Sequence, residues 1–339
     1  MTSLPKVSIV IAVGPWNDFL KESIRRCQEL EYPDYEIIVL PDDLPDQLPD
    51  GVQVIPTGRK SSPGYKRDLG AEHSKGSIIA FLDDDAYPAK GWLTAAVSVF
   101  LSDDSIGAVG GPAVTPPHDS LSQHASGLIY SSLLVGGNYR FRYIPQIQRD
   151  VDDYPTCNLL VRKDVFNDVS GFDTNFYPGE DTKLCLDITK KLGKRIVYHP
   201  DVLVYHHRRR MYKPHLRQVL NYGLHRGHFV KRFPETSFRL SYFLPSMWSL
   251  GVVAGWMVYF VHPWLFCFYT GVIAFYLLIA VLTSIKEGCQ AVVAKSLWDR
   301  IKLTYWIFTG LAATHFVYGL WFMKGLVIKH LPEEQSVRN

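Results

Sequence analysis

The sequence is poor in paired cysteines. It has five, an odd number, and they lie far apart at Cys27, Cys157, Cys185, Cys267 and Cys289. None of them stands in a CxxC pair, so the spacing gives no support for a zinc site or a redox dithiol. We therefore expect reduced thiols in a reducing compartment.

A strong net charge and a secretory leader are also missing. The 36 Lys and Arg nearly balance the 33 Asp and Glu, so charge gives no general attraction to nucleic acid, and no nucleic-acid partner is expected. The amino terminus has no basic stretch that leads into an apolar run with a small-residue cleavage site, which argues against a cleaved signal. The first domain is expected to stay in the cytosol.

Long apolar runs are abundant after Ser241. Charges recur every few residues before this point and nearly vanish in three later stretches, at 242–261, 264–284 and 303–323. Each run has about twenty residues, long enough to cross roughly 30 Å of hydrocarbon as a helix. Three such runs rarely occur together among the core helices of soluble proteins. We predict an integral membrane protein with a small all-α transmembrane domain at 242–328.

Charge and turn residues predict how these helices are connected. His262 and Pro263 supply a tight turn, so the first two runs form a helical hairpin. The segment before the third run carries Lys286, Lys295 and Arg300, and positive loops stay on the cytoplasmic side. The first domain shares that side, at an inner or plasma membrane, and three crossings would place the tail, 329–339, outside.

The region before residue 211 alternates β-rich runs with helical patterns. Apolar or β-branched runs predict strands, and the spacing of charged and apolar residues at 17–30 predicts a helix between the first two; the strands are expected at 7–13, 35–40, 52–56 and 77–82. This alternation predicts an α/β domain, 1–210, with a mostly parallel sheet and flanking helices. Ligands in such sheets bind at the carboxyl ends of the strands.

Three acids follow the strand at 77–82 directly. Asp83, Asp84 and Asp85 repel one another at the end of a buried strand unless a cation neutralises them. Their hard oxygen ligands suit Mg²⁺ or Mn²⁺ together with a diphosphate. The alternative is a solvated acidic turn.

Two further polar clusters follow neighbouring strands. Asp42 and Asp43 come after the strand at 35–40 and could accept hydrogen bonds from a base or a ribose, although acidic loops are ordinary. Ser62-Pro63-Gly64 leads to Lys66 and Arg67, whose charges could offset a diphosphate.

The order of these motifs resembles glycosyltransferase family 2. The likeness covers roughly residues 5 to 210 and rests on ordered segments, namely Val7-Ser-Ile-Val-Ile11, Glu36-Ile-Ile-Val-Leu-Pro-Asp42, Gly64-Tyr-Lys-Arg67, Phe81-Leu-Asp-Asp-Asp85, Cys157-Asn-Leu-Leu-Val-Arg162, Gly171-Phe-Asp173 and Gly179-Glu-Asp181. The resemblance implies a GT-A fold, inverting transfer, and a DxD motif around a divalent metal.

The resemblance also implies roles for single residues. The nucleotide-sugar would be held by Ala12, Gly14, Asp42, Gly64, Arg67, Asp83 and Asp84. The metal would be held by Asp83 and Asp85, with His206 completing the shell or contacting phosphate. His206 has a plainer alternative, a polar end to a strand.

Glu180 and Asp181 precede a helical pattern, 182–192, where free amides stabilise carboxylates. The resemblance implies that Asp181, beside Glu180, is the general base for the acceptor. A sugar hydroxyl must lose its proton as it attacks C1, whereas an ionised phosphate needs no such help, so a base favours a hydroxyl acceptor.

The sequence departs from the family pattern in two places. Relatives often carry an arginine several residues after the Glu-Asp pair, where this chain has Asp187. Ala12-Val-Gly-Pro-Trp16 replaces the usual Pro-Val-Tyr-Asn type of sequence. These departures concern the surroundings of the base and the nucleotide contact at Gly14.

Residues 211–241 link the two domains. The segment from Lys213 to Arg232 places Arg217, Arg226 and other cations among apolar positions, like a basic amphipathic helix on anionic headgroups. A helix packed on its own domain would look similar. Membrane lipids are thus an expected partner.

The combined pattern predicts single addition of a sugar from a nucleoside diphosphate, UDP-linked, to a hydroxyl of a lipid-linked or membrane-associated glycan. No QxxRW sequence follows the base, which argues against a processive polysaccharide synthase. Two alternatives stay open, transfer to polyprenyl phosphate and a catalytically inactive sugar-binding or scaffold protein.

Overall fold

The computed structural model describes residues 4–58, 61–172, 174 and 176–331 of the chain. Asp173 and the tail beyond Leu331 lie outside the described residues. The chain divides into two compact units. The first unit holds the residues up to Val114 and 141–207, and the second holds 115–140 and 208–331.

The first unit is built on a mostly parallel sheet. Among the described residues, eight strands lie in the order β3-β2-β1-β4-β9-β6-β10-β8. Their bounds are β1 Val7–Ala12, β2 Tyr35–Leu40, β3 Val52–Val54, β4 Ile78–Asp83, β6 Ile106–Gly110, β8 Arg149–Val151, β9 Asn158–Arg162 and β10 Arg195–Tyr198. Strands β3, β2, β1 and β4 are mutually parallel, while β9 runs against both β4 and β6. The predicted fold class is confirmed.

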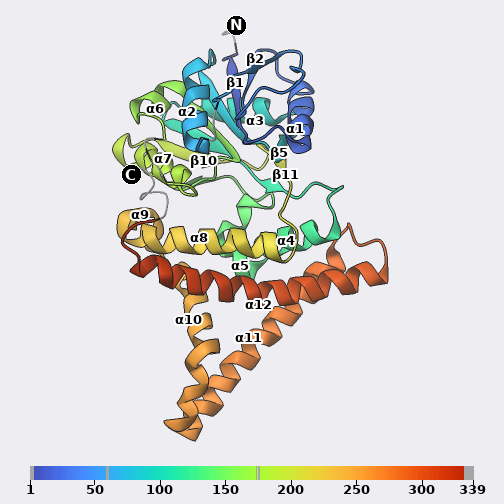
Figure 1. Ribbon diagram of the computed structural model, residues 1–339, viewed down its shortest axis with the longest axis vertical. Helices are drawn as coiled ribbons and strands as arrows, with labels where there is room; N and C mark the ends of the chain where they lie inside the picture. Colours follow the sequence, from blue (N-terminus) through green and yellow to red (C-terminus); the bar gives the residue numbers. More distant parts are fainter. Residues whose placement is uncertain (1–3, 59–60, 173, 175, 332–339) are drawn as a thin grey trace. The chain divides into compact units, whose positions relative to one another are not determined.

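Helices flank this sheet (Figure 1). They are α1 Asp18–Gln28, α2 Pro63–His73, α3 Trp92–Ser102, α6 Lys163–Asp168 and α7 Glu180–Leu186, and a π-helical turn, Asp187–Lys191, extends α7. Asn17 begins α1 by accepting a hydrogen bond from the Leu20 amide. Ser62 does the same for α2 through the Tyr65 amide. These caps satisfy amides that lack a partner inside the helix.

The buried core of the first unit explains why its strands could be recognised in the sequence. Ile9, Ile11, Val39 and Leu82 are buried in one apolar cluster between the sheet and its helices. The central strands are buried on both faces, so they read as continuous apolar runs rather than as alternating ones. The predicted strands therefore match the observed ones to within two residues at each end.

A small second sheet also belongs to the first unit. Its strands are β5 Ala86–Pro88, β7 Ala113–Val114 and β11 Val204–His206, in the order β5-β11-β7. β11 runs antiparallel to β5, with His206 opposite Ala86. This pairing brings His206 next to the three acids that precede β5, Asp83, Asp84 and Asp85.

The second unit is helical. Its elements are α4 Leu121–Ser131, α5 Leu133–Gly136, the 3-10 helix Gly137–Arg142 that leads back to the first unit, α8 Lys213–Arg232, α9 Pro234–Ser237, α10 Leu240–Ala254, the 3-10 turn Gly255–Phe260, α11 Pro263–Gln290 and α12 Leu297–Val327. The sequence predicts one continuous domain over 1–210, whereas the structure groups 115–140 with the later helices. The reason is packing, since Ala125 and Ile129 of α4 share an apolar cluster with Leu303 and Ile307 of α12.

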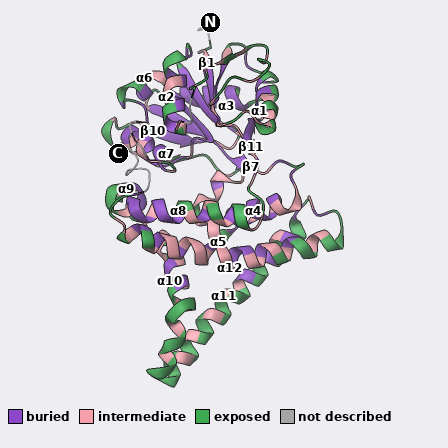
Figure 2. Ribbon diagram, in the orientation of Figure 1, coloured by how far each residue is buried: buried purple, intermediate pink, exposed green. Residues whose placement is uncertain are grey.

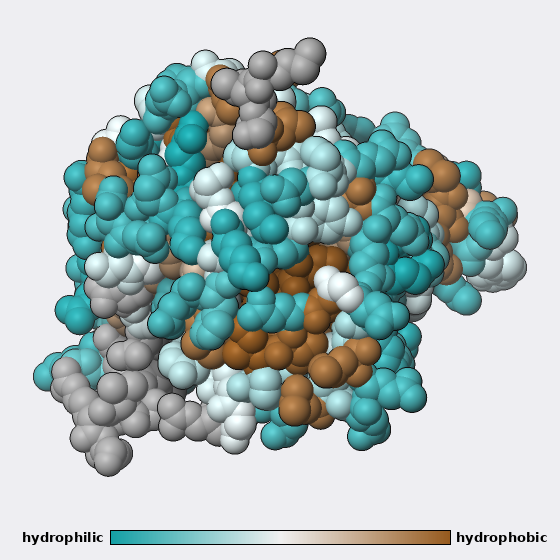
Figure 3. Space-filling model, turned by 90° about the horizontal axis from the view of Figure 1, so that it is seen from above, coloured by the Kyte–Doolittle hydropathy of each residue, from teal (hydrophilic) through white to brown (hydrophobic). Residues whose placement is uncertain are grey.

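Three helices of this unit are long and apolar enough to cross a membrane. They span Leu240–Phe260, Pro263–Gln290 and Leu297–Val327. The turn falls at the predicted residues, because His262 Nδ1 caps α11 by accepting from the Trp264 amide at 3.1 Å. Figure 2 shows exposed side chains along most of the α10 and α11 hairpin. The surface in Figure 3, by contrast, is mainly hydrophilic, with an apolar patch near its centre.

Candidate active site

The carboxyl ends of three parallel strands form one edge of the sheet. Ala12, the last residue of β1, lies opposite Leu40 of β2 and Asp83 of β4. The loops after these strands therefore start side by side. The predicted residues at Gly14, Asp42 and Asp83 are brought together by this register.

Gly14 and Asp42 lie against each other. The Asp42 amide donates to the Gly14 carbonyl at 3.1 Å, and a Cβ built on Gly14 would be 3.7 Å from Asp42 Oδ2. Lys66 reaches the same place from α2. Its buried ammonium contacts Asp42 Oδ1 and the Val13 carbonyl, each at 2.5 Å. The charge of Lys66 thus orients Asp42 and fixes the end of β1.

Arg67, the next residue of α2, binds two carboxylates from distant parts of the chain. Its Nη2 lies 2.8 Å from Asp83 Oδ1, and its Nη1 lies 2.7 Å from Glu180 Oε1. The guanidinium is buried, which opposes its charge, but the two carboxylates outweigh the burial and hold the pKa of Arg67 above its ordinary value. Arg67 therefore stays charged and joins the acid triplet to α7.

The three acids at the end of β4, Asp83, Asp84 and Asp85, have different partners. Asp84 accepts a hydrogen bond from Asn17 Nδ2 at 2.7 Å. Asp83, Asp85 and His206 instead each offer one ligand atom to a cluster in which these atoms lie within 4.8 Å of one another. His206 Nε2 is 3.1 Å from Asp85 Oδ1. The alternation along the chain separates the middle acid from the outer two, as a DxD motif requires.

This donor set fits a divalent cation. Two carboxylates and an imidazole offer hard oxygen ligands and one nitrogen, a combination that Mn²⁺ accepts and Mg²⁺ tolerates with added water or phosphate oxygens. The three side chains come from a strand end, the following turn and β11. Their approach is set by the pairing of β11 with β5.

Glu180 and Asp181 begin α7 after Gly179, whose φ of 124° favours glycine. Glu180 is buried, and besides binding Arg67 it accepts from the Gly179 amide at 3.0 Å. Asp181 is half-buried, and its Oδ1 accepts from the Thr182 amide at 2.8 Å. The two neighbouring acids thus have different surroundings.

Asp187 takes its partners from its own helical segment. It is buried, and its carboxylate contacts Lys183 and Lys191 one turn to either side. Asp187, in the region where the family pattern often has arginine, therefore forms ion pairs within its own helix in this chain.

Tyr177 was not predicted from the sequence. Partial burial of the hydroxyl and the negative charges of Asp83 and Glu180 raise the pKa of Tyr177 to about 12, although half of the side chain is exposed. The phenol therefore stays protonated at neutral pH. A lone tyrosine before a proline carries no pattern that could have marked it.

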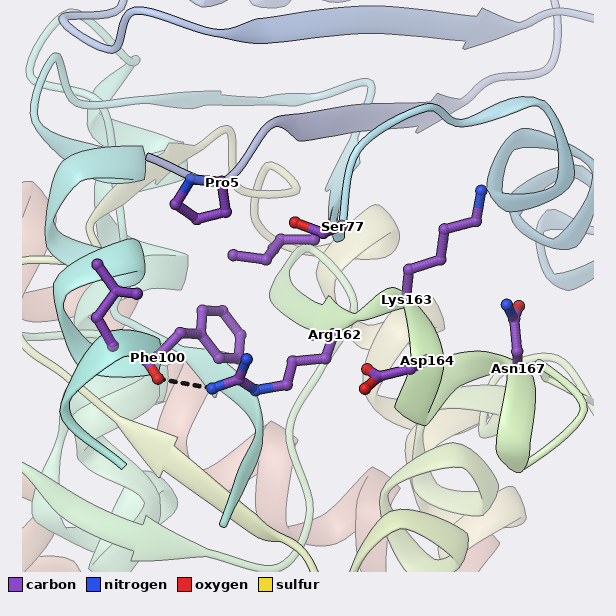
Figure 4. A pocket seen from close by; sticks show the side chains of 9 residues that line it. Pro5, Ser77, Phe100, Arg162, Lys163, Asp164 and Asn167 are labelled. Atoms are coloured by element: carbon purple, nitrogen blue, oxygen red, sulfur yellow. Dashed lines mark hydrogen bonds between the residues drawn. The ribbon is translucent and has the colours of Figure 1, made fainter. Parts of the chain in front are cut away.

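A cavity in the first unit lies away from these residues. It has a volume of about 430 Å³ and is lined by Ser77, Phe100, Arg162, Lys163 and others. Figure 4 shows Arg162 reaching the Phe100 carbonyl, a contact of 2.6 Å. The cavity adjoins the first residue of β4, Ile78, whereas the acid cluster follows the last one. The cavity therefore lies at the edge of the sheet opposite to the acid cluster.

Comparison with known proteins finds a matching family model and several related glycosyltransferases. Residues 8–170 match the model of glycosyl transferase family 2. The chain is 26% identical over 208 residues to the pre-mycofactocin glycosyltransferase of Mycobacterium tuberculosis, a match that covers 61% of this chain and 42% of that protein. It is 27% identical over 149 residues to the glucosyl-dolichyl phosphate glucuronosyltransferase of Haloferax volcanii, covering 42% and 46% of the two chains. These matches span less than half the length of either relative.

A solved structure shares the fold. The mannosyltransferase PcManGT of Pyrobaculum calidifontis, determined with GDP-Man and Mn²⁺, superposes with a TM-score of 0.53 at 17% identity and covers 97% of this chain and 89% of its own. The likeness identifies the fold of the first unit as GT-A.

Proposed function

We propose that this glycosyltransferase, whose residues 8–170 form a glycosyl transferase family 2 domain, moves a sugar from a nucleoside diphosphate to a hydroxyl of a lipid-linked or membrane-associated glycan. The observation that carries the proposal is the meeting of Asp83, Asp85 and His206 with the Arg67 and Glu180 pair at one sheet edge. A UDP-linked donor and inversion at C1 belong to the same proposal.

The donor is held by the loops after the first strands. Ala12, Gly14 and Asp42 line the end nearest β1 and β2 and would receive the base and ribose, with Lys66 holding Asp42 in place. Gly64 lies at the start of α2, where a Cβ would be 3.9 Å from Glu180. Its small size leaves room for the sugar diphosphate beside Arg67.

Asp83, Asp85 and His206 would hold the divalent metal. When bound, this ion supplies Lewis-acid stabilisation of the diphosphate leaving group. Asp84 accepts a hydrogen bond from Asn17, so it would contact the nucleotide and not the metal. Arg67 keeps a fixed positive charge next to Asp83, which adds to the attraction for a leaving diphosphate.

Asp181 is the proposed base. Its carboxylate would accept the proton of the acceptor hydroxyl while the hydroxyl oxygen forms a bond to C1 and the bond from C1 to the diphosphate oxygen breaks. Glu180 is engaged by Arg67 and by the Gly179 amide, so it orients the start of α7. A positioned base favours a sugar hydroxyl over an ionised polyprenyl phosphate.

The test uses the purified full chain with each nucleotide sugar, with Mn²⁺ or Mg²⁺, and with a lipid-linked sugar or polyprenyl phosphate as acceptor. Asp85→Ala should lower metal-dependent binding of the nucleotide and reduce transfer by about a hundredfold or more, because the cluster loses a carboxylate ligand. Asp46→Ala, in an exposed loop, is the matched control.

Calorimetry with UDP and Mn²⁺ separates binding from chemistry. Unchanged affinity and activity in Asp85→Ala would remove Asp85 from the site. Transfer confined to polyprenyl phosphate would support the alternative acceptor. No release of any nucleoside diphosphate would leave a binding or scaffold protein as the function.

A further inference from the structure

The third apolar helix, α12, packs over much of its length against a charged helix, α8. We propose that α12 lies along the membrane surface as the partner of α8, and that only the α10 and α11 hairpin enters the hydrocarbon. The two helices form one lipid-facing pair, the α8–α12 plate. This inference concerns the second unit alone and does not rest on the proposed function.

Three side-chain contacts show that α8 and α12 run parallel and in register. Tyr212, at the start of α8, bonds Thr309 at 2.8 Å, and His215 bonds Thr314 at 2.9 Å. Lys231, at the end of α8, donates to the Ile328 carbonyl at 2.8 Å. The partners are separated by 97, 99 and 97 positions in the sequence. A constant offset means that the helices stay side by side over the whole length of α8.

Glycines let the two backbones touch. A Cβ on Gly227 of α8 would lie 2.1 Å from the Phe322 carbonyl oxygen of α12, and one on Gly325 of α12 would lie 2.1 Å from the Leu224 carbonyl oxygen of α8. Gly223 has the Tyr318 carbonyl at 2.7 Å. With backbones this close, the two helices move as one body.

The charges of α8 limit where α8 and α12 can lie relative to the bilayer. Lys213, Arg217, Lys231 and Arg232 are exposed along α8, and Arg226 lies between them. If α12 crossed the bilayer, α8 would cross beside it and carry arginines into the hydrocarbon. Each arginine near the bilayer centre is costly to insert. A position along the surface avoids this cost.

The first half of α12 is covered by the other part of the second unit. Ala125 and Ile129 of α4 pack with Leu303, Ile307 and Leu311 of α12. α4 has only 11 residues, about half of the roughly 20 that a spanning helix needs, so it too is unsuited to cross. Elements that cannot cross therefore flank α12 from Leu303 to Ile328.

The hairpin behaves differently from α12. Only 11% and 6% of the apolar windows of its two arms are buried, against 33% for α12. In Figure 1, α8 and α12 run side by side while α10 and α11 project from α12 as a hairpin. Both arms join α12 through close contacts, Gly319 with the Pro245 carbonyl and Gly288 with Thr304. The α8–α12 plate is thus in direct contact, through α12, with both arms of the apolar hairpin.

The uncovered side of α12 suits a lipid surface. Its first turns expose Leu297, Trp298, Ile301 and Tyr305. Near the other end, the Lys324 ammonium lies over the Trp321 ring at 5.9 Å. Aromatic rings beside lysines are typical of the headgroup region. Two crossings would place residue 329 on the same side as α8, in place of the three crossings predicted from the sequence.

Cysteine accessibility tests this placement. In a full-length chain with Cys267→Ala and Cys289→Ala, single reporters are Asp46→Cys in the first unit, Val261→Cys at the hairpin turn and Lys329→Cys after α12. Right-side-out and inverted vesicles from expressing cells are treated with a membrane-impermeant maleimide. We expect Lys329→Cys to react in the same vesicles as Asp46→Cys, and Val261→Cys in the opposite ones. Reaction of Lys329→Cys from the face opposite to Asp46→Cys would overturn the proposal.

A cross-link tests the pairing without reference to topology. Lys231→Cys with Ile328→Cys should join through a short bifunctional maleimide, since Lys231 contacts residue 328. The control, Arg217→Cys with Ile328→Cys, places the α8 thiol about 21 Å further along the helix at 1.5 Å per residue. Equal cross-linking of both pairs, or none at 231 and 328 in a chain that labels at both sites, would contradict the α8–α12 plate.

Discussion

Arg67 contacts carboxylates that the sequence assigns to different tasks. Asp83 belongs to the predicted metal set, and Glu180 adjoins the predicted base. Glu180 uses its two oxygens on Arg67 and on the Gly179 amide, so both oxygens are already engaged by fixed partners. Of the two neighbouring acids, Asp181 is therefore the one suited to proton transfer.

Asp181→Asn keeps the size of the side chain and the acceptor for the Thr182 amide but removes proton affinity. We expect donor and metal to bind nearly as in the parent enzyme while transfer to a hydroxyl falls by about a hundredfold or more. Transfer rates and donor affinity are measured on the same preparation. Near-normal transfer would falsify the assignment of Asp181 as base.

His215 makes stability depend on pH. It is buried between Ser126 and Thr314, and burial lowers its pKa to about 4, whereas an unfolded histidine titrates near 6.5. Between these values the unfolded chain binds a proton that the folded chain does not, so stability falls as pH drops, by up to about 1.4 kcal/mol per pH unit. The melting temperature should fall more between pH 7 and pH 5 in the parent than in His215→Gln. Equal falls would show that His215 is not the responsible group.

Single residues mark how far sequence reasoning reaches. Asp83, Asp85 and His206 could be grouped in advance because strand ends and family motifs locate them, and the structure places them together; their roles stay predictions. The sequence indicates that the charge of Lys66 could offset a diphosphate, but it does not show that the ammonium contacts Asp42 and the Val13 carbonyl. Tyr177 had no pattern at all. Directions of buried side chains depend on packing that no local pattern encodes.

At the scale of elements, the α8–α12 plate depends on glycine. Gly227→Leu places a side chain where the Phe322 carbonyl already lies 2.1 Å away, so the helices must separate. Overpacking of this kind costs about 1–3 kcal/mol, and more where backbone is hit. The matched control is Gly251→Leu in α10, where a Cβ has open space. Melting temperature and folded yield in detergent should drop for Gly227→Leu alone. Similar values for both variants would argue against close backbone packing.

Elements marked by a continuous apolar run or by amphipathic helical spacing were predictable. The runs that became β1, β2 and β4 and the basic helix at Lys213–Arg232 lie where the sequence places them. The grouping of 115–140 with the later helices was not predictable, because α4 has the composition of an ordinary surface helix. Its place is decided by apolar contacts with α12, residues far away in the chain. Long-range packing of this sort is invisible to a local window.

At the scale of the whole molecule, a catalytic unit with its own core is joined to a unit whose hairpin exposes apolar side chains. Exposed Phe260, Trp264, Phe268 and Phe275 would cost free energy in water, roughly 25 cal/mol for each Å² of apolar surface. Such an apolar surface is typical of membrane insertion. The hairpin is thus suited to anchor the chain, and in the placement proposed above the α8–α12 plate would add a second, weaker attachment through basic and aromatic side chains.

If the hairpin is the main membrane anchor, a charge placed in it should weaken membrane attachment. Val272 is half-exposed within the apolar part of α11, so Val272→Arg places a charge in the hydrocarbon at a cost of about 2.5–3.5 kcal/mol. The insertion equilibrium of the hairpin should fall by about two orders of magnitude, leaving the surface attachment to hold the chain. Alkaline carbonate, which strips surface-bound proteins, should then release Val272→Arg from membranes while the parent and Val272→Leu stay in the pellet. If Val272→Arg resists extraction as the parent does, that part of α11 lies outside the hydrocarbon.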